Sequence, residues 1–243
     1  MRKLLNTLYI TNPEAYLSKD GLNVVVTVKQ VEVLRIPILN IESIIYFGYM
    51  GASPGLMKLC TENHVSLTFM TPTGHYIARV QGATYGNVLL RTKQYALSKD
   101  EAFALHVSTH IIASKIQNYR YILQRFLRDY GDNPSVSAAA DALKNSKEKA
   151  LRTTSADLLR GIEGDAANTY FGVFGQLILH NKNEFPFHGR NKRPPRDAVN
   201  AMLSFAYTLI ANDYTAGLET VGLDPYVASC TPYVRGGHRW LWT

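Results

Sequence analysis

A carboxylate set among small residues is the first place where this sequence could support chemistry. Glu163 stands in the segment 158–167, LLRGIEGDAA, with a glycine two residues before it and another directly after it. The glycines predict that one helix ends and the next begins here, which would place Glu163 beside a positive helix N-terminus. The alternative is a ligand for a hard divalent metal. In that case Gly164, Ala166 and Ala167 would let a second helix or a DNA backbone approach closely.

The second candidate is a basic loop at residues 186–196, PFHGRNKRPPR. Four cations alternate there with prolines behind an aromatic residue, and they are Arg190, Lys192, Arg193 and Arg196. Prolines stiffen a loop, so the positive charges would project outward as a phosphate clamp does. A solvated run of surface charge is the other interpretation.

The histidines and cysteines form no convincing metal or disulfide pattern. His106 and His110 are four residues apart on one face of a predicted helix, a spacing that can bind zinc, but no acidic or cysteine partner is near them. We therefore expect no zinc site. The two cysteines, Cys60 and Cys230, are far apart in sequence, which argues against a disulfide framework and is typical of a reducing cytoplasm.

The elements that must position these residues change character near Gly86. The first 85 residues are rich in short β-prone runs around one helix, which Ser53 caps and Pro54 begins. The expected strands are 4–10, 23–28, 31–36, 41–47, 65–70 and 76–80. Asp20-Gly21 and residues 71–74 are turn signals.

Beyond Gly86 the apolar residues recur at helical spacing. A capping box at 98–101 predicts the start of a long helix that ends at residues 131–134. The other expected helices are 87–96, 135–145, 147–160, 163–180 and 197–219. The predicted fold class is α+β, with a small β-rich domain at 1–85, a linker helix at 86–98 and an all-α domain at 99–243.

Composition limits the partners. The chain has 243 residues, 46% of them hydrophobic, and no apolar run long enough to cross a bilayer. Its N-terminus lacks the features of a signal peptide. We therefore expect a cytoplasmic protein with no membrane partner. The net charge of +7 favours a polyanionic partner, with simple solubility as the alternative.

Several segments, in this order, resemble the CRISPR-associated integrase, the first-numbered protein of the Cas set, in its subtype I-C form. The resemblance extends almost without a break from Met1 to Val227. The matching stretches are Leu4–Tyr9, Phe47–Pro54, Gly86–Arg91, Leu158–Phe174, Phe185–Phe205 and Gly222–Pro225.

The resemblance implies a β domain, an incomplete helical catalytic domain and a homodimer that binds a small ferredoxin-like partner, the second-numbered Cas protein. It implies a metal-dependent DNA endonuclease and integrase, which inserts new spacers into the CRISPR array in antiviral defence. In this chemistry a 3′-hydroxyl attacks a phosphodiester while Mg or Mn polarises the phosphate. The family's metal is held by a glutamate, a histidine and an aspartate, and Glu163 matches the glutamate.

The last sixteen residues depart from the family pattern. The pattern would place the ligand histidine at position 231 and the aspartate at 243, where this chain has Thr231 and Thr243. If residues 228–243 are back-translated and each codon is begun one base earlier, the permitted codons spell the missing family motif with both ligands. We therefore expect a frameshift after Val227, with a divergent natural C-terminus as the alternative.

Three functions remain open at this point. The first is an integrase by descent that is catalytically impaired because only Glu163 is left of three metal ligands. The second is a non-catalytic remnant that binds DNA and dimerises. The third is a degraded gene product without function. Metal-dependent nicking of DNA separates the first from the others, and DNA binding without nicking separates the second from the third.

Overall fold

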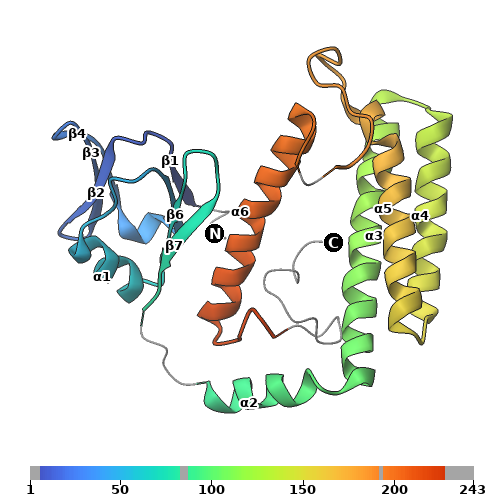
Figure 1. Ribbon diagram of the computed structural model, residues 1–243, viewed down its shortest axis with the longest axis horizontal. Helices are drawn as coiled ribbons and strands as arrows, with labels where there is room; N and C mark the ends of the chain where they lie inside the picture. Colours follow the sequence, from blue (N-terminus) through green and yellow to red (C-terminus); the bar gives the residue numbers. More distant parts are fainter. Residues whose placement is uncertain (1–5, 83–86, 192–193, 228–243) are drawn as a thin grey trace. The chain divides into compact units, whose positions relative to one another are not determined.

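The computed structural model describes residues 6–82, 87–191 and 194–227, which form two compact units (Figure 1). The first unit comprises the chain up to Asn87 together with Thr208–Gly222. The second comprises Val88–Tyr207 and the chain from Leu223 onward. No described helix has the length and apolar character that a membrane crossing requires.

Two small sheets and one helix build the first unit. One sheet has the strand order β1-β5-β6-β7, with β1 parallel to β5, β5 parallel to β6 and β7 antiparallel to β6. The other is an antiparallel meander, β2-β3-β4. The elements are β1 (Thr7–Ile10), β2 (Ala15–Asp20), β3 (Asn23–Val28), β4 (Val31–Pro37), η1 (Ile38–Asn40), β5 (Ser43–Phe47), α1 (Pro54–Glu62), β6 (Ser66–Met70) and β7 (Tyr76–Val80).

The core of this unit lies where the two sheets and α1 meet. Its buried side chains come from β2, β3, β5, β6 and α1, among them Leu17, Val24, Ile44, Leu56 and Leu67. Tyr46 is fully buried in the same cluster, and its hydroxyl donates to the carbonyl of Pro13 at 3.0 Å and accepts from the amide of Met50 at 3.1 Å. These bonds satisfy a polar atom that would otherwise be costly to bury.

The second half of a late helix also belongs to the first unit. Helix α6 spans Ala198–Thr220, and its Leu209 packs against Ile45, Phe47 and Met70. Near its end Glu219 forms an ion pair with Arg79 of β7, and their side chains are only 19% and 10% exposed. The described β-rich unit is therefore completed by residues that follow the helical domain in sequence.

The second unit is helical. It contains α2 (Val88–Leu97), α3 (Glu101–Tyr130), α4 (Pro134–Arg152), α5 (Ala156–Phe174), η2 (Gly175–Leu177) and the first part of α6. Helices α3, α4 and α5 lie side by side (Figure 1) and share one buried cluster. The largest fully buried side chains in it are Ile116, Leu123, Leu143 and Leu159.

The predicted α+β fold class is confirmed, and most strands and helices lie within a few residues of their predicted positions. Strand β2 was missed. The long helix begins two residues later than the capping box suggested, because its N-cap is Asp100, whose side chain accepts from the amide of Phe103 at 3.0 Å.

Two expected helix breaks are absent. Helix α4 runs through residues 145–147, and α5 runs through Gly161 and Gly164 from its N-cap at Ser155. A glycine inside a helix costs only about 1 kcal/mol. Burial of Leu159, Ala166 and Tyr170 on one face of α5 outweighs that cost.

Candidate functional site

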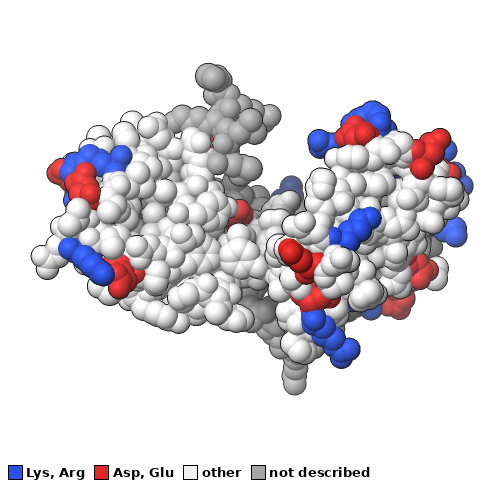
Figure 2. Space-filling model, turned by 90° about the horizontal axis from the view of Figure 1, so that it is seen from above, with Lys and Arg blue, Asp and Glu red and all other residues white. Residues whose placement is uncertain are grey.

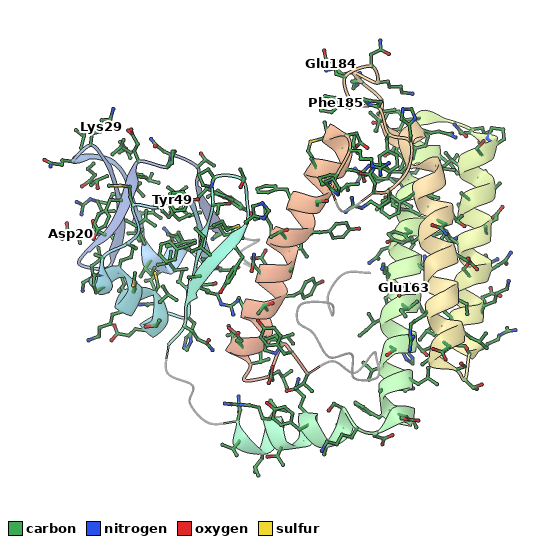
Figure 3. All side chains as sticks on the ribbon, in the orientation of Figure 1. Asp20, Lys29, Tyr49, Glu163, Glu184 and Phe185 are labelled. Carbon is green, nitrogen blue, oxygen red and sulfur yellow. The ribbon has the colours of Figure 1, made fainter. Side chains whose placement is uncertain are left out.

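Glu163 lies in the middle of α5, so the prediction that it begins a helix was wrong. The N-terminus of α5 is two turns away, beyond the range of the helix dipole. The Glu163 side chain is 17% exposed, and Figure 3 labels it in the helical unit. Its carboxylate therefore needs a different stabilising group from the one the sequence suggested.

That group is a lysine on the neighbouring helix. Lys115 of α3 donates from Nζ to Oε1 of Glu163 at 2.5 Å, and its side chain is 30% exposed. The sequence alone gave no role to Lys115. One feature of the sequence could have pointed to Lys115. It is a charged residue directly before the buried Ile116, in a helix whose other inward positions are mostly apolar.

Tyrosines lie beside this pair. Tyr119 of α3 and Tyr170 of α5 are stacked, with ring centroids 4.2 Å apart and planes 6° from parallel. Burial raises the pKa of Tyr170 to about 12. Burial, followed by the neighbouring Tyr207, Tyr170 and Glu163, also raises the pKa of Tyr119. Both phenols therefore stay neutral at physiological pH.

Arg190 of the basic loop points into the protein. Its guanidinium donates to the side-chain oxygen of Asn200 at 2.8 Å, to the carbonyl of Asn191 at 2.7 Å and to the hydroxyl of Ser204 at 3.3 Å. It also lies over the ring of Tyr207, 5.5 Å from the centroid. Burial lowers the pKa of Arg190. Arg190 thus fastens the loop to α6 in this structure.

Asn200 is the buried centre of the same network and was missed from the sequence. It is fully buried, and its side-chain amide donates to the carbonyl of Gly189 at 2.9 Å and to Asp197 at 2.6 Å. Its backbone amide donates to Asp197 Oδ1 at 2.7 Å, as the third residue after an N-cap does. Bonds from the Asn200 side chain and backbone lower the pKa of Asp197.

The remaining loop cations differ from Arg190. The side chain of Arg196 is exposed, while its backbone amide donates to Asn191 Oδ1 at 2.7 Å. Lys192 and Arg193 lie outside the described residues. On the face shown in Figure 2, positive side chains are scattered groups mixed with negative ones, so that face carries no continuous basic surface.

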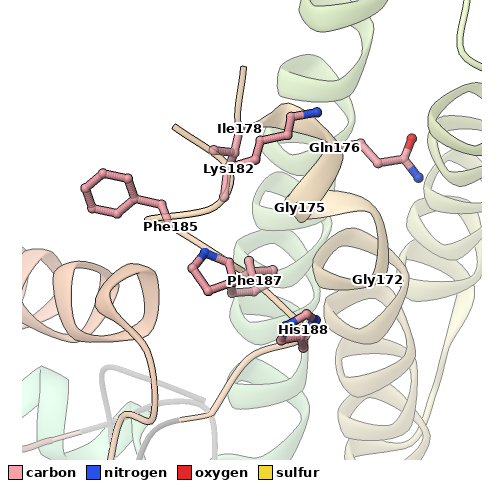
Figure 4. Close-up of a pocket in the computed structure, with 9 residues that line it drawn as sticks. Gly172, Gly175, Gln176, Ile178, Lys182, Phe185, Phe187 and His188 are labelled. Carbon is pink, nitrogen blue, oxygen red and sulfur yellow. The ribbon is translucent and has the colours of Figure 1, made fainter. Parts of the chain in front are cut away.

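A shallow pocket of about 350 Å³ lies between the end of α5 and the loop, as Figure 4 shows. It is lined by Gly172, Gly175, Gln176, Ile178, Lys182, Phe185, Pro186, Phe187 and His188. A Cβ at Gly175 would lie 3.1 Å from the carbonyl of Phe187, so a small residue at this position lets the loop pack against α5.

The described residues do not complete a metal site. No group of three or more histidine, cysteine, aspartate or glutamate side chains comes together among them. The rings of His106 and His110 are 4.5 Å apart, with the Nδ1 of His110 2.8 Å from the carbonyl of His106. Positions 231 and 243 of the expected ligands lie outside the described residues. Glu163 is thus a single carboxylate that already contacts an ammonium group.

The sequence of this chain matches a known protein family. The family model for "CRISPR associated protein Cas1" matches residues 8–230. A relative from Rhodospirillum rubrum, named CRISPR-associated endonuclease Cas1 2, is 42% identical over 93% of this chain and 67% of its own length. The chain spans about two thirds of the length of this relative and of a 39% identical Cas1 endonuclease from Chlorobaculum tepidum.

Solved structures share the fold. A Cas1 protein from Thermotoga maritima aligns with a TM-score of 0.73 at 20% identity, over 93% of this chain and 68% of that one. A chain of a Cas6-RT-Cas1–Cas2 complex aligns with a TM-score of 0.68 at 21% identity, over 90% of this chain and 24% of that one. From the family match and the 42% identical relative, the chain belongs to the Cas1 family of CRISPR-associated proteins.

Proposed function

We propose that this chain derives from a DNA endonuclease and integrase that inserts new spacers into a CRISPR array, and that it retains DNA binding while its catalysis is impaired. The match of the family to residues 8–230, which includes Glu163 and the whole basic loop, carries the proposal. The name of the Rhodospirillum rubrum relative supports the endonuclease activity. The Cas1–Cas2 assembly among the structural neighbours is consistent with a role in spacer acquisition.

Impaired catalysis follows from the ligand set. The expected chemistry uses Mg or Mn held by three side chains, of which Glu163 matches one, while positions 231 and 243 of the other two carry threonine. A hard cation bound by one carboxylate keeps most of its water and is poorly oriented toward a phosphate. We therefore assign no step of DNA cleavage to a bound metal in this chain.

The impairment is best explained by a frameshift in a subtype I-C gene. The family match stops at residue 230, close to Val227, where the shifted reading begins. Thr231 stands where the ligand histidine is expected. The shifted codons of 228–243 permit the expected histidine and aspartate, which a randomly diverged sequence would rarely do.

DNA binding is assigned to the loop. Arg196 is exposed, and together with Lys192 and Arg193 it supplies three positive charges for phosphates. Arg190 is included in the predicted interface, but its bonds to Asn200 and Ser204 give it the further task of holding the loop in shape.

We also propose a homodimer formed through the β-rich unit, and binding of the second-numbered, ferredoxin-like Cas protein. The strand β4 exposes Val31 and Val33, and the loop after β5 exposes Tyr49 and Met50. These exposed apolar side chains are available for contact with a second copy of the chain. The alternative, a non-catalytic remnant that binds DNA and dimerises, is favoured by the contact of Glu163 with Lys115.

The deciding experiment is Mn-dependent nicking of a branched DNA by the 243-residue chain beside a frame-corrected chain. We expect no nicking above background by the 243-residue chain and clear nicking by the corrected one. Glu163→Ala in the corrected chain should abolish that activity. Robust nicking by the 243-residue chain that depends on Glu163 would show that the metal site or the tail has been misassigned.

DNA binding is tested separately, in EDTA, by fluorescence anisotropy over a range of salt. Replacing Lys192, Arg193 and Arg196 by alanine should weaken binding and reduce the salt dependence by about three charges. Alanine at Lys144, Lys149 and Arg152, three exposed cations of α4, is the charge-matched control. Equal effects of the two triple variants would exclude the loop as the specific interface.

A further inference from the structure

The contact between Lys115 and Glu163 is one of two ion pairs in the described part of the chain in which both side chains are less than one third exposed. The other joins Arg79 to Glu219. Only the Lys115 pair includes a residue of the candidate catalytic site. Its lysine therefore stands at the carboxylate where the family's chemistry would require a divalent cation.

We infer that Lys115 is the resident counter-charge of Glu163 in this chain, and that a divalent cation must displace its ammonium group to reach the carboxylate. The Nζ of Lys115 lies 2.5 Å from Oε1, so this oxygen is already in direct contact with a positive charge. A second cation at the same oxygen would be repelled by the first.

The backbones on both sides of the contact are fixed. Lys115 is followed by Ile116, which is 1% exposed, and Glu163 lies between Leu159 and Ala166, which are 2% and 0% exposed. The ion pair can therefore be broken only by movement of the two side chains. Lysine is suited to such an exchange because its ammonium is a compact charge on a flexible four-carbon stem.

Removing the positive charge of Lys115 should therefore strengthen the binding of a divalent cation at Glu163. Without Lys115 the partly buried carboxylate would lose a positive neighbour and present a net negative site. With one carboxylate, cation binding by the unaltered chain should be weak. Loss of the competing charge should strengthen it on the order of ten-fold, since charges a few ångströms apart near a protein surface interact strongly.

The test is the affinity of Mn²⁺ for the full 243-residue chain, measured by the electron paramagnetic resonance of free Mn²⁺. Lys115→Met, which keeps most of the aliphatic stem, should bind Mn²⁺ about ten-fold more tightly than the unaltered chain. Lys115→Arg, which keeps the charge, should stay within about two-fold of it. The gain should vanish in the double variant Lys115→Met with Glu163→Gln, which would assign it to this carboxylate.

An unchanged or weaker affinity of Lys115→Met would overturn the inference, as would a gain that survives Glu163→Gln. Circular dichroism of each variant checks the helices. If methionine at position 115 prevents folding, acetyl-lysine incorporated there removes the charge with a near-native shape and must give the same gain. The readout involves neither DNA nor nicking, so its failure is distinct from failure of the proposed function.

Discussion

The two least exposed ion pairs of the described chain do different work in the two units. Arg79 and Glu219 are 140 residues apart in sequence and tie the end of α6 to β7 in the first unit. Lys115 and Glu163 are 48 residues apart and join α3 to α5 in the second. The arginine side chain is 10% exposed and the lysine side chain 30%.

The difference in exposure between Arg79 and Lys115 indicates that the first pair is structural, whereas the lysine of the second can be exchanged for another cation. A planar guanidinium that is only 10% exposed makes fixed contacts and cannot regain its hydration without moving its neighbours. A lysine that is partly open to solvent can leave its partner at little cost. We therefore expect the first pair to control stability and the second to control which cation reaches Glu163.

The largest effect is expected at the first pair. Arg79→Met should lower the free energy of unfolding of the first unit by about 3 kcal/mol, because it removes the less exposed of the two cations from a pair that is largely shielded from water. Urea unfolding followed by circular dichroism measures it. Arg35→Met, in a more exposed network with Asp20 and Glu32, is the control and should cost clearly less, because exposed ion pairs contribute little. Equal losses of unfolding free energy in the two variants would show that the Arg79 pair contributes no more than an exposed one.

The apolar contact of α6 should come next. Leu209→Ala removes a side chain that packs on Ile45, Phe47 and Met70, and should cost about 2 kcal/mol. Ile210→Ala, one residue further along and exposed, should cost under about 0.5 kcal/mol. If the two substitutions were equivalent in thermal unfolding, α6 would not be part of the first unit's core.

The network of the basic loop should give an effect of about 1 kcal/mol. Asp197→Ala removes the acceptor of the Asn200 amide at the start of α6, a loss typical of an N-cap. Because its bonds with Asn200 lower the pKa of Asp197, its carboxylate stabilises the folded state above the ordinary pKa of 3.8. That stability is lost as the pH falls through the lowered value.

The difference in unfolding free energy between Asp197→Ala and the unaltered chain should therefore shrink below about pH 4, as the carboxylate of the unaltered chain is protonated. Urea unfolding at pH 7 and in the acid range measures this change. Asn168→Ala, at an exposed position of α5 and without a titrating group, is the control. A difference that grows as the pH falls would contradict the assigned role of Asp197.

The smallest effect on stability should be at the second pair. Lys115→Met should change the free energy of unfolding by only about 0.5 kcal/mol, because its 30% exposed ammonium keeps part of its hydration, although Glu163 is as little exposed as Glu219. Thermal unfolding of the 243-residue chain is sufficient to detect it. A loss comparable to that of Arg79→Met would make the Lys115 pair structural, and the contrast between the two units would disappear.

The sequence predicted what depends on local pattern. The β-branched run of β3 and the Ser53-Pro54 start of α1 matched the structure residue for residue, because neighbours in sequence determine them. The helix break predicted at Gly161 and Gly164 was wrong, because tertiary packing of α5 overrides the weak local preference of these glycines.

The site depends on distant residues and was predicted only in part. Glu163 was singled out, but its partner Lys115 lies on another helix, and no local pattern joins the two. Charge and prolines suggested that Arg190 projects outward, whereas Asn200, ten residues later, draws it inward. The assignment of 208–222 to the first unit likewise rests on contacts with strands more than 120 residues earlier.

The buried hydroxyl of Tyr46 also limits how this protein can change over generations. A Cβ on Gly48 would lie 2.5 Å from that hydroxyl oxygen, so no residue larger than glycine fits while the tyrosine remains. Replacing the tyrosine alone would leave the carbonyl of Pro13 and the amide of Met50 without their bond. The two positions are therefore coupled in descent, because the first step in either direction passes through a less stable intermediate.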